Sequence, residues 1–135
     1  MTVSFDYQYV GESYFGKIYR PVAKVTFKSP KTNIYLTTWM VVDSGADHTI
    51  LPASLSQKLD ISLKNDCQKD VTAGIGGEQT IYFLKSKIQA QIGKISKKVP
   101  LGFLDSKDVP PLLGRLGFME LFEVILKKNK VVFKE

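Results

Sequence analysis

Hydrophobic and polar residues alternate along much of the chain with the period of two that is typical of β-strands. Stretches rich in β-branched and aromatic residues are separated by short turn signals. The strands predicted in this way cover residues 2–10, 17–27, 33–42, 80–92 and 130–135. The turn signals are Gly16, Gly93 and the segments 29–33, 74–77 and 109–114. The pattern therefore predicts an all-β fold.

Two segments depart from this alternation and are predicted to form short helices. Residues 52–60 begin with a proline, which suits the first turn of a helix, and they place Leu55 and Leu59 four positions apart. Residues 114–122 place several apolar side chains on one side. We therefore predict one domain over residues 1–135, a small closed or half-closed β-barrel with one or two short helices.

Length and composition limit the class of protein. A chain of 135 residues with 44% hydrophobic and 24% charged residues is typical of a single globular domain. Its apolar runs are far shorter than the ~18–20 residues of a membrane span, and its first residues do not resemble a secretory signal. We therefore expect a cytoplasmic protein with no membrane partner. Cys67 is the only cysteine, which excludes an intrachain disulfide and a cysteine-built metal site. We also expect no other metal site and no cofactor.

The basic residues are dispersed along the chain. The net charge is +6, and Arg20 and Arg115 are the only arginines among 19 basic residues. Nucleic-acid-binding proteins cluster basic residues and favour arginine, so we expect no nucleic-acid partner. A lysine-rich, solvated surface that also protects sheet edges explains the charge more simply. The alternative, a basic barrel that binds single strands, predicts binding with a steep dependence on salt.

An ionisable residue interrupts an apolar stretch near the middle of the chain. Four apolar residues, 39–42, lead directly into Asp43, which is followed by Ser44 and Gly45. A carboxylate at the end of a buried strand is costly unless it is hydrogen-bonded, paired or used. The tripeptide alone is equally typical of a turn after a strand. Because apolar sequence resumes at once, Asp43 is the first candidate for a functional carboxylate.

Two further motifs follow it. Residues 72–80 contain three glycines around an isoleucine, which lets the tip of a hairpin adopt positive φ and approach a ligand closely. Residues 110–118 place Leu112 and Leu113 before Gly114, where the chain can pack closely against another backbone. Taken alone, the first is equally typical of an ordinary hairpin and the second of an ordinary helix start.

In this order and spacing, the three motifs resemble single-domain retropepsin-like aspartic proteases, the fold of retroviral proteases and their bacterial and archaeal relatives. In that family an apolar strand ends in Asp-Thr/Ser-Gly-Ala, a glycine-rich flap follows, and a hydrophobic-hydrophobic-Gly element precedes a C-terminal helix. The matching segments here are 41–47, 74–77 and 112–115. Residues 51–52 and 110–118 are more similar to prokaryotic members of the family than to viral ones.

The resemblance implies an aspartic endopeptidase. Such enzymes activate a water molecule with two carboxylates that share one proton. The chain holds a single Asp-Ser-Gly, since the Asp-Ser at 105–106 is followed by lysine. The resemblance therefore implies a homodimer in which Asp43 of each subunit faces its own copy, with a peptide or protein as substrate. The alternative is a non-hydrolytic retropepsin-like domain that binds peptides or dimerises, because a fold alone does not determine function.

The resemblance also assigns roles to the residues around Asp43. Ser44 stands where the hydroxyl of the family reaches the opposite loop, and Gly45 lets the backbone approach both the aspartate and the substrate; Ala46 completes this support. Asp47 is implied to bind the substrate backbone and to pair with Arg115, whose fork suits a carboxylate. The other residues implied to bind substrate are Ile75, Gly76 and Gly77, and those implied to hold the site together are Leu113 and Gly114. His48 follows the loop of Asp43 and is expected either to line a substrate pocket or, equally, to have a surface or turn role.

Some features depart from retroviral enzymes. Ser44 replaces the usual threonine, and the segment before Asp43 is longer, so residues 1–15 could be a dimer arm, a removable extension or another strand. Retroviral enzymes build a dimer sheet from both termini, and residues 129–135 could do so here. Trp39 is expected in the core. The aromatic residues expected to cover the barrel are Tyr7, Tyr9, Tyr14 and Phe15.

Overall fold

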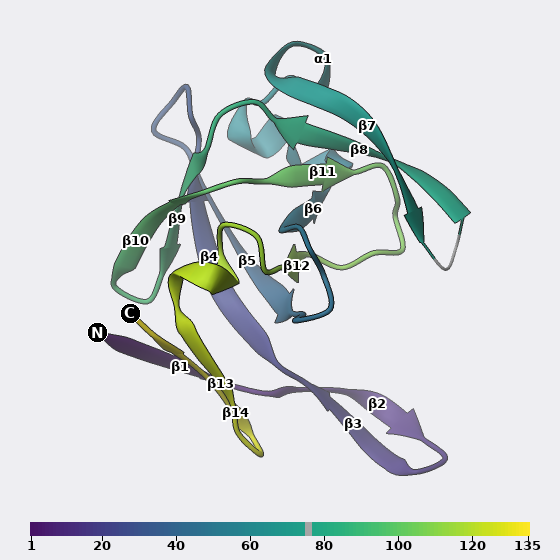
Figure 1. Cartoon of the computed structure of the whole chain (residues 1–135), viewed down its shortest axis with the longest axis vertical. Coiled ribbons are helices and arrows are strands. Elements are labelled where there is room, and N and C mark those ends of the chain that lie inside the picture. The colour runs from purple at the N-terminus through teal and green to yellow at the C-terminus, as the bar shows by residue number, and fades with distance from the viewer. Residues whose placement is uncertain (75–76) are drawn as a thin grey trace.

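One strongly curved sheet forms the body of the computed structural model, which describes residues 1–74 and 77–135 (Figure 1). Its strands in spatial order are β10 (Ile95–Val99), β9 (Ile88–Ile92), β4 (Val22–Lys28), β5 (Tyr35–Val42), β12 (Leu112–Leu113), β6 (Ile50–Pro52), β11 (Gly102–Leu104), β8 (Gly77–Leu84) and β7 (Cys67–Gly74). Neighbouring strands are antiparallel except for the pairs β5–β12 and β6–β11, which are parallel. The predicted all-β, half-barrel fold is confirmed.

Two smaller sheets lie beside this body. The chain termini form a sheet in which β14 (Lys130–Lys134) lies between β1 (Thr2–Asp6) and β13 (Glu123–Leu126). Both neighbours are antiparallel to β14, and the backbone N–H of Glu135 donates to the carbonyl of Met1 at 3.0 Å. The strands β2 (Gln8–Ser13) and β3 (Gly16–Arg20) pair only with each other among the described residues, as a separate hairpin. Figure 1 shows this hairpin projecting away from the body.

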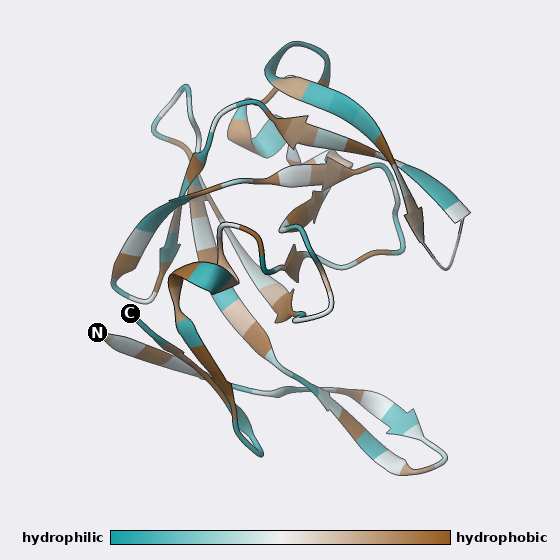
Figure 2. Ribbon diagram, viewed as in Figure 1, coloured by the Kyte–Doolittle hydropathy of each residue, from teal (hydrophilic) through white to brown (hydrophobic). Residues whose placement is uncertain are grey.

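The core lies on the concave side of the curved sheet. Alternate residues of β4 point inward, so that Ala23, Val25 and Phe27 are fully buried while Lys24 and Thr26 between them are not. Burial of each large apolar side chain contributes about 1.5–3 kcal/mol. Figure 2 shows hydrophilic colour on the first half of β7, the outer strand of the sheet, and hydrophobic colour toward its end. The largest side chains of this core include Phe27, Phe103, Phe118 and Phe133.

The helix predicted over residues 52–60 is two separate 3₁₀ turns, η1 (Ala53–Leu55) and η2 (Gln57–Leu59). Pro52 ends strand β6 and is also the N-cap of η1, so a helical turn does start there as predicted. The second turn ends at Asp60, whose φ of 54° is left-handed and cannot continue a right-handed helix. A short helix that was not predicted, α1 (Leu63–Asp66), follows.

The helix predicted over residues 114–122 is also much shorter. Only η3 (Met119–Leu121) is helical, as a single 3₁₀ turn. Gly117 has a φ of 71°, a left-handed conformation that interrupts the predicted helix at its centre. The C-terminal helix implied by the resemblance is therefore reduced to this turn.

Several predicted strands are divided by a change of direction. Residues 17–27 form two strands, β3 and β4, because Pro21 between them has no N–H with which to continue a ladder. Residues 2–10 divide at Tyr7, whose N–H donates to the carbonyl of Asn129 and not to a neighbouring strand. Strands β6, β7, β10, β11, β12 and β13 were not among those predicted.

Candidate active site

The loop after β5 presents the carboxylate of Asp43. The parallel pairing of β5 with β12 sets Val42 opposite Leu113, and the backbone N–H of Asp43 continues this ladder by donating to the carbonyl of Leu113 at 3.0 Å. Its Oδ1 accepts the N–H of Gly45 at 2.9 Å, and its carbonyl accepts the N–H of Ala46 at 3.1 Å. Asp43 is half-buried, at the edge of the protein surface. The carboxylate is thus fixed by its own turn and still accessible.

The residues beside Asp43 lie at different depths. Ser44 and Gly45 are exposed, and Ala46 is half-buried. A Cβ on Gly45 would lie 3.2 Å from Oδ1 of Asp43, which is closer than ordinary van der Waals contact. Glycine at this position therefore lets the turn close tightly on the carboxylate.

The segment after β12 is joined to the loop of Asp43 by backbone hydrogen bonds. The N–H of Arg115 donates to the carbonyl of Ala46, and the N–H of Leu116 donates to the carbonyl of Asp47, each at 2.9 Å. Leu113 itself is completely buried. The two motifs singled out in the sequence, 41–47 and 112–115, therefore lie together and fix each other's backbone.

Gly114 lies where no side chain fits. A Cβ at this position would overlap the backbone of His48, 2.5 Å from its carbonyl carbon, and would lie 3.0 Å from the carbonyl oxygen of Ala46. The N–H of Gly114 donates to Oγ1 of Thr49 at 3.1 Å, and Thr49 is 2% exposed. Glycine here allows two loop backbones to touch.

Thr49 is a positioning residue that sequence reasoning missed. Its hydroxyl satisfies Gly114, and its carbonyl accepts the N–H of Gly102 in β11 at 2.9 Å. It thereby connects the loop of Asp43 with β11 and with the segment that follows β12. The available signal was a single hydroxyl residue between His48 and the apolar pair Ile50–Leu51.

Asp47 and Arg115 form an ion pair between Oδ1 and Nη2, which joins the two motifs a second time. Both side chains are about half exposed, at 64% for the aspartate and 48% for the arginine. Exposed pairs contribute only about 0–1 kcal/mol to stability. The pair therefore orients two side chains beside Asp43 more than it stabilises the fold.

His48 faces the second strand of the glycine-rich hairpin. Its ring packs edge-on against Phe83 of β8, with ring centroids 4.9 Å apart. The two rings help to line a small cavity of about 20 Å³.

The glycine-rich motif is a hairpin. Strands β7 and β8 pair along their whole length, and Gly74 lies opposite Gly77 at the tip. Gly77 is exposed and has a φ of 98°, so its conformation favours glycine. Ile75 and Gly76, which were also predicted to contact substrate, lie outside the described residues.

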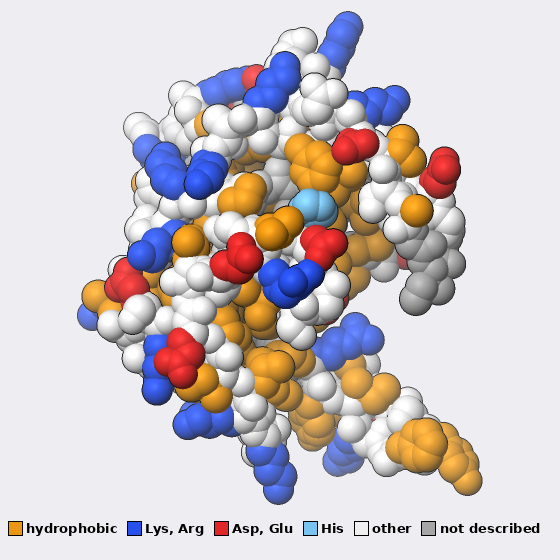
Figure 3. Space-filling view, in the orientation of Figure 1, with side chains coloured by type: hydrophobic (Ala, Val, Ile, Leu, Met, Phe, Trp, Pro, Cys, Tyr) orange, Lys and Arg blue, Asp and Glu red, His pale blue; other side chains and the backbone are white. Residues whose placement is uncertain are grey.

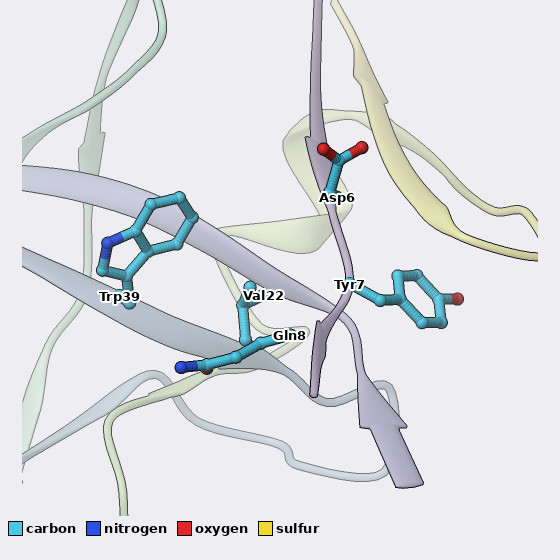
Figure 4. Close-up of a pocket in the computed structure, with 5 residues that line it drawn as sticks. All are labelled: Asp6, Tyr7, Gln8, Val22 and Trp39. Atoms are coloured by element: carbon cyan, nitrogen blue, oxygen red, sulfur yellow. The ribbon is translucent and has the colours of Figure 1, made fainter. Parts of the chain in front are cut away.

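A larger pocket is lined by none of the predicted site residues (Figure 4). It has a volume of about 230 Å³ and is lined by Asp6, Tyr7, Gln8, Val22 and Trp39. Trp39 is 52% exposed and packs edge-on against Phe5, so its expected place in the core was wrong. It points outward because β5 alternates, and the residue that faces the core is its neighbour Met40.

Comparison with known proteins identifies the fold and the family. Residues 35–118, more than half of the chain, match the family model described as "gag-polyprotein putative aspartyl protease". The chain belongs to the retropepsin-like aspartic proteases. The crystal structure of a retropepsin-like aspartic protease from Rickettsia conorii is similar over 98% of both chains, with a TM-score of 0.66 and 16% identity. No curated protein sequence matches the chain significantly.

Membership of the retropepsin-like family indicates a peptidase, and members of this family act as dimers on peptide substrates. Within residues 1–74 and 77–135, no cluster of three or more His, Cys, Asp or Glu residues is arranged to hold a metal ion. In the same part of the chain, every helix is too short or too polar to cross a membrane.

Proposed function

We propose that this retropepsin-like chain is an aspartic endopeptidase whose catalytic dyad consists of Asp43 from each of two identical subunits. The observation that carries the proposal is the geometry of that one residue. Its Oδ1 is fixed by the N–H of Gly45, and the carboxylate lies half-buried beside exposed Ser44 and Gly45. A single chain supplies half of a dyad, and a two-fold axis beside this loop supplies the other half.

The proposed reaction uses two carboxylates and one shared proton. The ionised carboxylate takes a proton from a water molecule while the water oxygen attacks the scissile carbonyl carbon. The protonated partner carboxyl donates its proton to the carbonyl oxygen. The resulting tetrahedral diol collapses when the C–N bond breaks. The leaving nitrogen takes a proton from the first carboxyl group, and one diol hydroxyl returns its proton to the second. The dyad thus ends with the single proton with which it began, and no cofactor is required.

The surrounding residues are proposed to hold the loops and the substrate. Ser44 would donate to the partner's loop, and Gly45 and Asp47 would offer polar groups to an extended peptide. The hairpin β7–β8 is proposed to be a flap, with Gly77 at its described end, that closes over the peptide and excludes water. His48 would form part of the wall of a side-chain pocket, together with Phe83.

The proposal is tested by incubating the chain with a denatured protein mixture from about pH 3 to about pH 8 while its molar mass is measured. We expect cleavage with a bell-shaped pH profile, because the dyad is active only while it carries one proton. We also expect the rate per chain to fall on dilution, in step with the conversion of dimer to monomer.

Two results would contradict the proposal. A rate per chain that stays constant while the protein dissociates into monomers would exclude a dyad shared between subunits. A stable dimer that binds peptides and leaves them uncut at every pH would favour the non-hydrolytic alternative.

A further inference from the structure

The hairpin β2–β3 carries an unusually exposed group of apolar side chains. Tyr14 and Phe15 at its tip are 94% and 97% exposed, and Tyr9, Val10 and Tyr19 on its strands are also exposed. Figure 3 shows hydrophobic side chains gathered at the far end of this projection. An isolated two-stranded hairpin is marginally stable in water, and a contiguous exposed apolar group marks an interaction surface.

The exposed side chains are held in order by contacts within the hairpin. Tyr14 and Phe15 pack edge to face with centroids 5.4 Å apart, and Tyr9 and Tyr19 do the same at 5.5 Å. At the turn, the hydroxyl of Ser13 accepts the N–H of Phe15 at 3.2 Å and donates to the carbonyl of Gly16 at 3.3 Å. The tip is therefore a defined aromatic surface, which a partner can bind without first ordering it.

The base of the hairpin lies next to the proposed catalytic residue. Pro21, directly after β3, accepts the backbone N–H of Val42 at 2.9 Å, and Val42 precedes Asp43. A two-fold dimer that brings the two Asp43 side chains together must also bring both hairpin bases close to its axis. Because a six-residue strand spans about 20 Å, each hairpin is long enough to lie along the other subunit.

The direction of the hairpin leaves room for that subunit. Figure 1 shows the hairpins β2–β3 and β7–β8 projecting on the same side of the body, with the loop between β5 and β6 between them. In Figure 3 the surface is deeply hollowed between these two projections. A second copy whose Asp43 meets this loop would enter that hollow and contact the hairpin.

The C-terminal strand cannot build a dimer sheet directly. A strand pairs with a partner only through a free edge, and β14 is bonded on one side to β1 and on the other to β13 within its own chain. Residues 129–135 therefore do not offer a free strand edge for a sheet shared between two subunits, which the retroviral resemblance had left open. Pairing through β14 itself is therefore closed, and the hairpin β2–β3 is an exposed apolar surface whose base lies beside Asp43.

We propose that the β2–β3 hairpin is the arm that holds the second copy of this chain, with Tyr14 and Phe15 packed against the partner. The inference rests on the proposed Asp43 dyad, which needs that second copy. It selects the first of the three interpretations of the N-terminal segment, with the arm placed at residues 8–20.

The test compares the double variant Y14S/F15S with the wild-type chain by sedimentation and by cleavage of a denatured protein mixture. The proposed dimer buries both aromatic side chains, so their loss is expected to raise the dimer Kd by about thirtyfold or more. Cleavage should fall at low concentration and return at high concentration, because the catalytic residues are unchanged. A matched control is I34S/Y35S, which changes an exposed pair (50% and 56% exposed). These residues lie at the start of β5, the end of the strand remote from Asp43, so this variant should leave the dimer Kd unchanged.

The other outcomes separate this inference from the proposed function. If Y14S/F15S dimerises and cleaves like the wild type, the arm is excluded and the dyad stands. If the wild-type chain is monomeric at every concentration, both fail. A third outcome is that Y14S/F15S dimerises with the wild-type Kd but no longer binds phosphatidylserine vesicles that the wild-type chain does bind. The tip then binds membranes, and the arm is excluded.

Discussion

The Asp43→Asn variant is expected to lose peptide cleavage by about 10⁴-fold while keeping its fold and its dimer. An amide has nearly the same shape as the carboxylate, and its oxygen can still accept the N–H of Gly45, so the turn should be retained. It can neither take a proton from water nor pass one to the carbonyl oxygen. The measurements are initial rates of cleavage, with molar mass and urea unfolding recorded on the same preparation.

Asp105→Asn is the matched control, because Asp105 is the other aspartate that is followed directly by serine. It is exposed, and its backbone N–H donates to Thr80 and not to the loop of Asp43. This variant should cleave at the wild-type rate. Undiminished cleavage by Asp43→Asn, or an equal loss in both variants, would show that Asp43 is not the catalytic carboxylate.

Gly114→Ala is expected to have the second largest effect. The added Cβ would meet the backbone of His48 and Ala46, which cannot rotate out of the way as a side chain can. Overpacking of this kind costs about 1–3 kcal/mol, and backbone contacts favour the upper end of that range. Because Arg115 bonds Ala46 directly, the loop of Asp43 must shift, and a displacement of about 1 Å can reduce the rate about 100-fold. Urea unfolding and cleavage rates measure the two effects.

Gly102→Ala provides the comparison for that variant. A Cβ at Gly102, also buried, would lie 3.1 Å from Cδ1 of Ile81, the far end of a flexible side chain that can move. We expect a smaller loss of stability and a cleavage rate close to that of the wild type. The contradicting result is that Gly114→Ala is as stable and as active as Gly102→Ala. It would show that the loop of Asp43 is positioned by something other than close backbone packing at Gly114.

The fold class and the centre of the candidate site could be predicted because they depend on local sequence. The alternation along β4 and β5 is explicit, and the apolar run before Asp43 is the strand that the structure contains. The expected meeting of the Asp43 and Gly114 motifs came from a family resemblance. The structure supplies its physical reason, which is that β12 pairs in parallel with β5 and no side chain fits at Gly114.

What could not be predicted depends on contacts between distant segments. Strand β11 is only three residues long, and it is defined by its partners β6 and β8. The spacing of Leu116 and Met119 suggested a helix, but the left-handed Gly117 lies between them. The role of Thr49 was hidden because its partner Gly114 is 65 residues away.

The aromatic residues of the N-terminal segment show the same limit. Tyr14 and Phe15 were expected to cover the barrel because large apolar side chains are usually buried. They instead lie at the end of a hairpin that leaves the body at Pro21. Composition records how apolar a segment is, and only the tertiary structure shows whether the rest of the chain covers it.

The most direct test of a dyad shared between subunits is to refold wild-type and Asp43→Asn chains together in different proportions and measure cleavage at constant total protein. If each active centre needs Asp43 from both subunits, activity should follow the square of the wild-type fraction, and an equal mixture should retain about a quarter of it. Activity that falls in simple proportion, to about half in the equal mixture, would show that each chain works alone and would contradict the shared dyad.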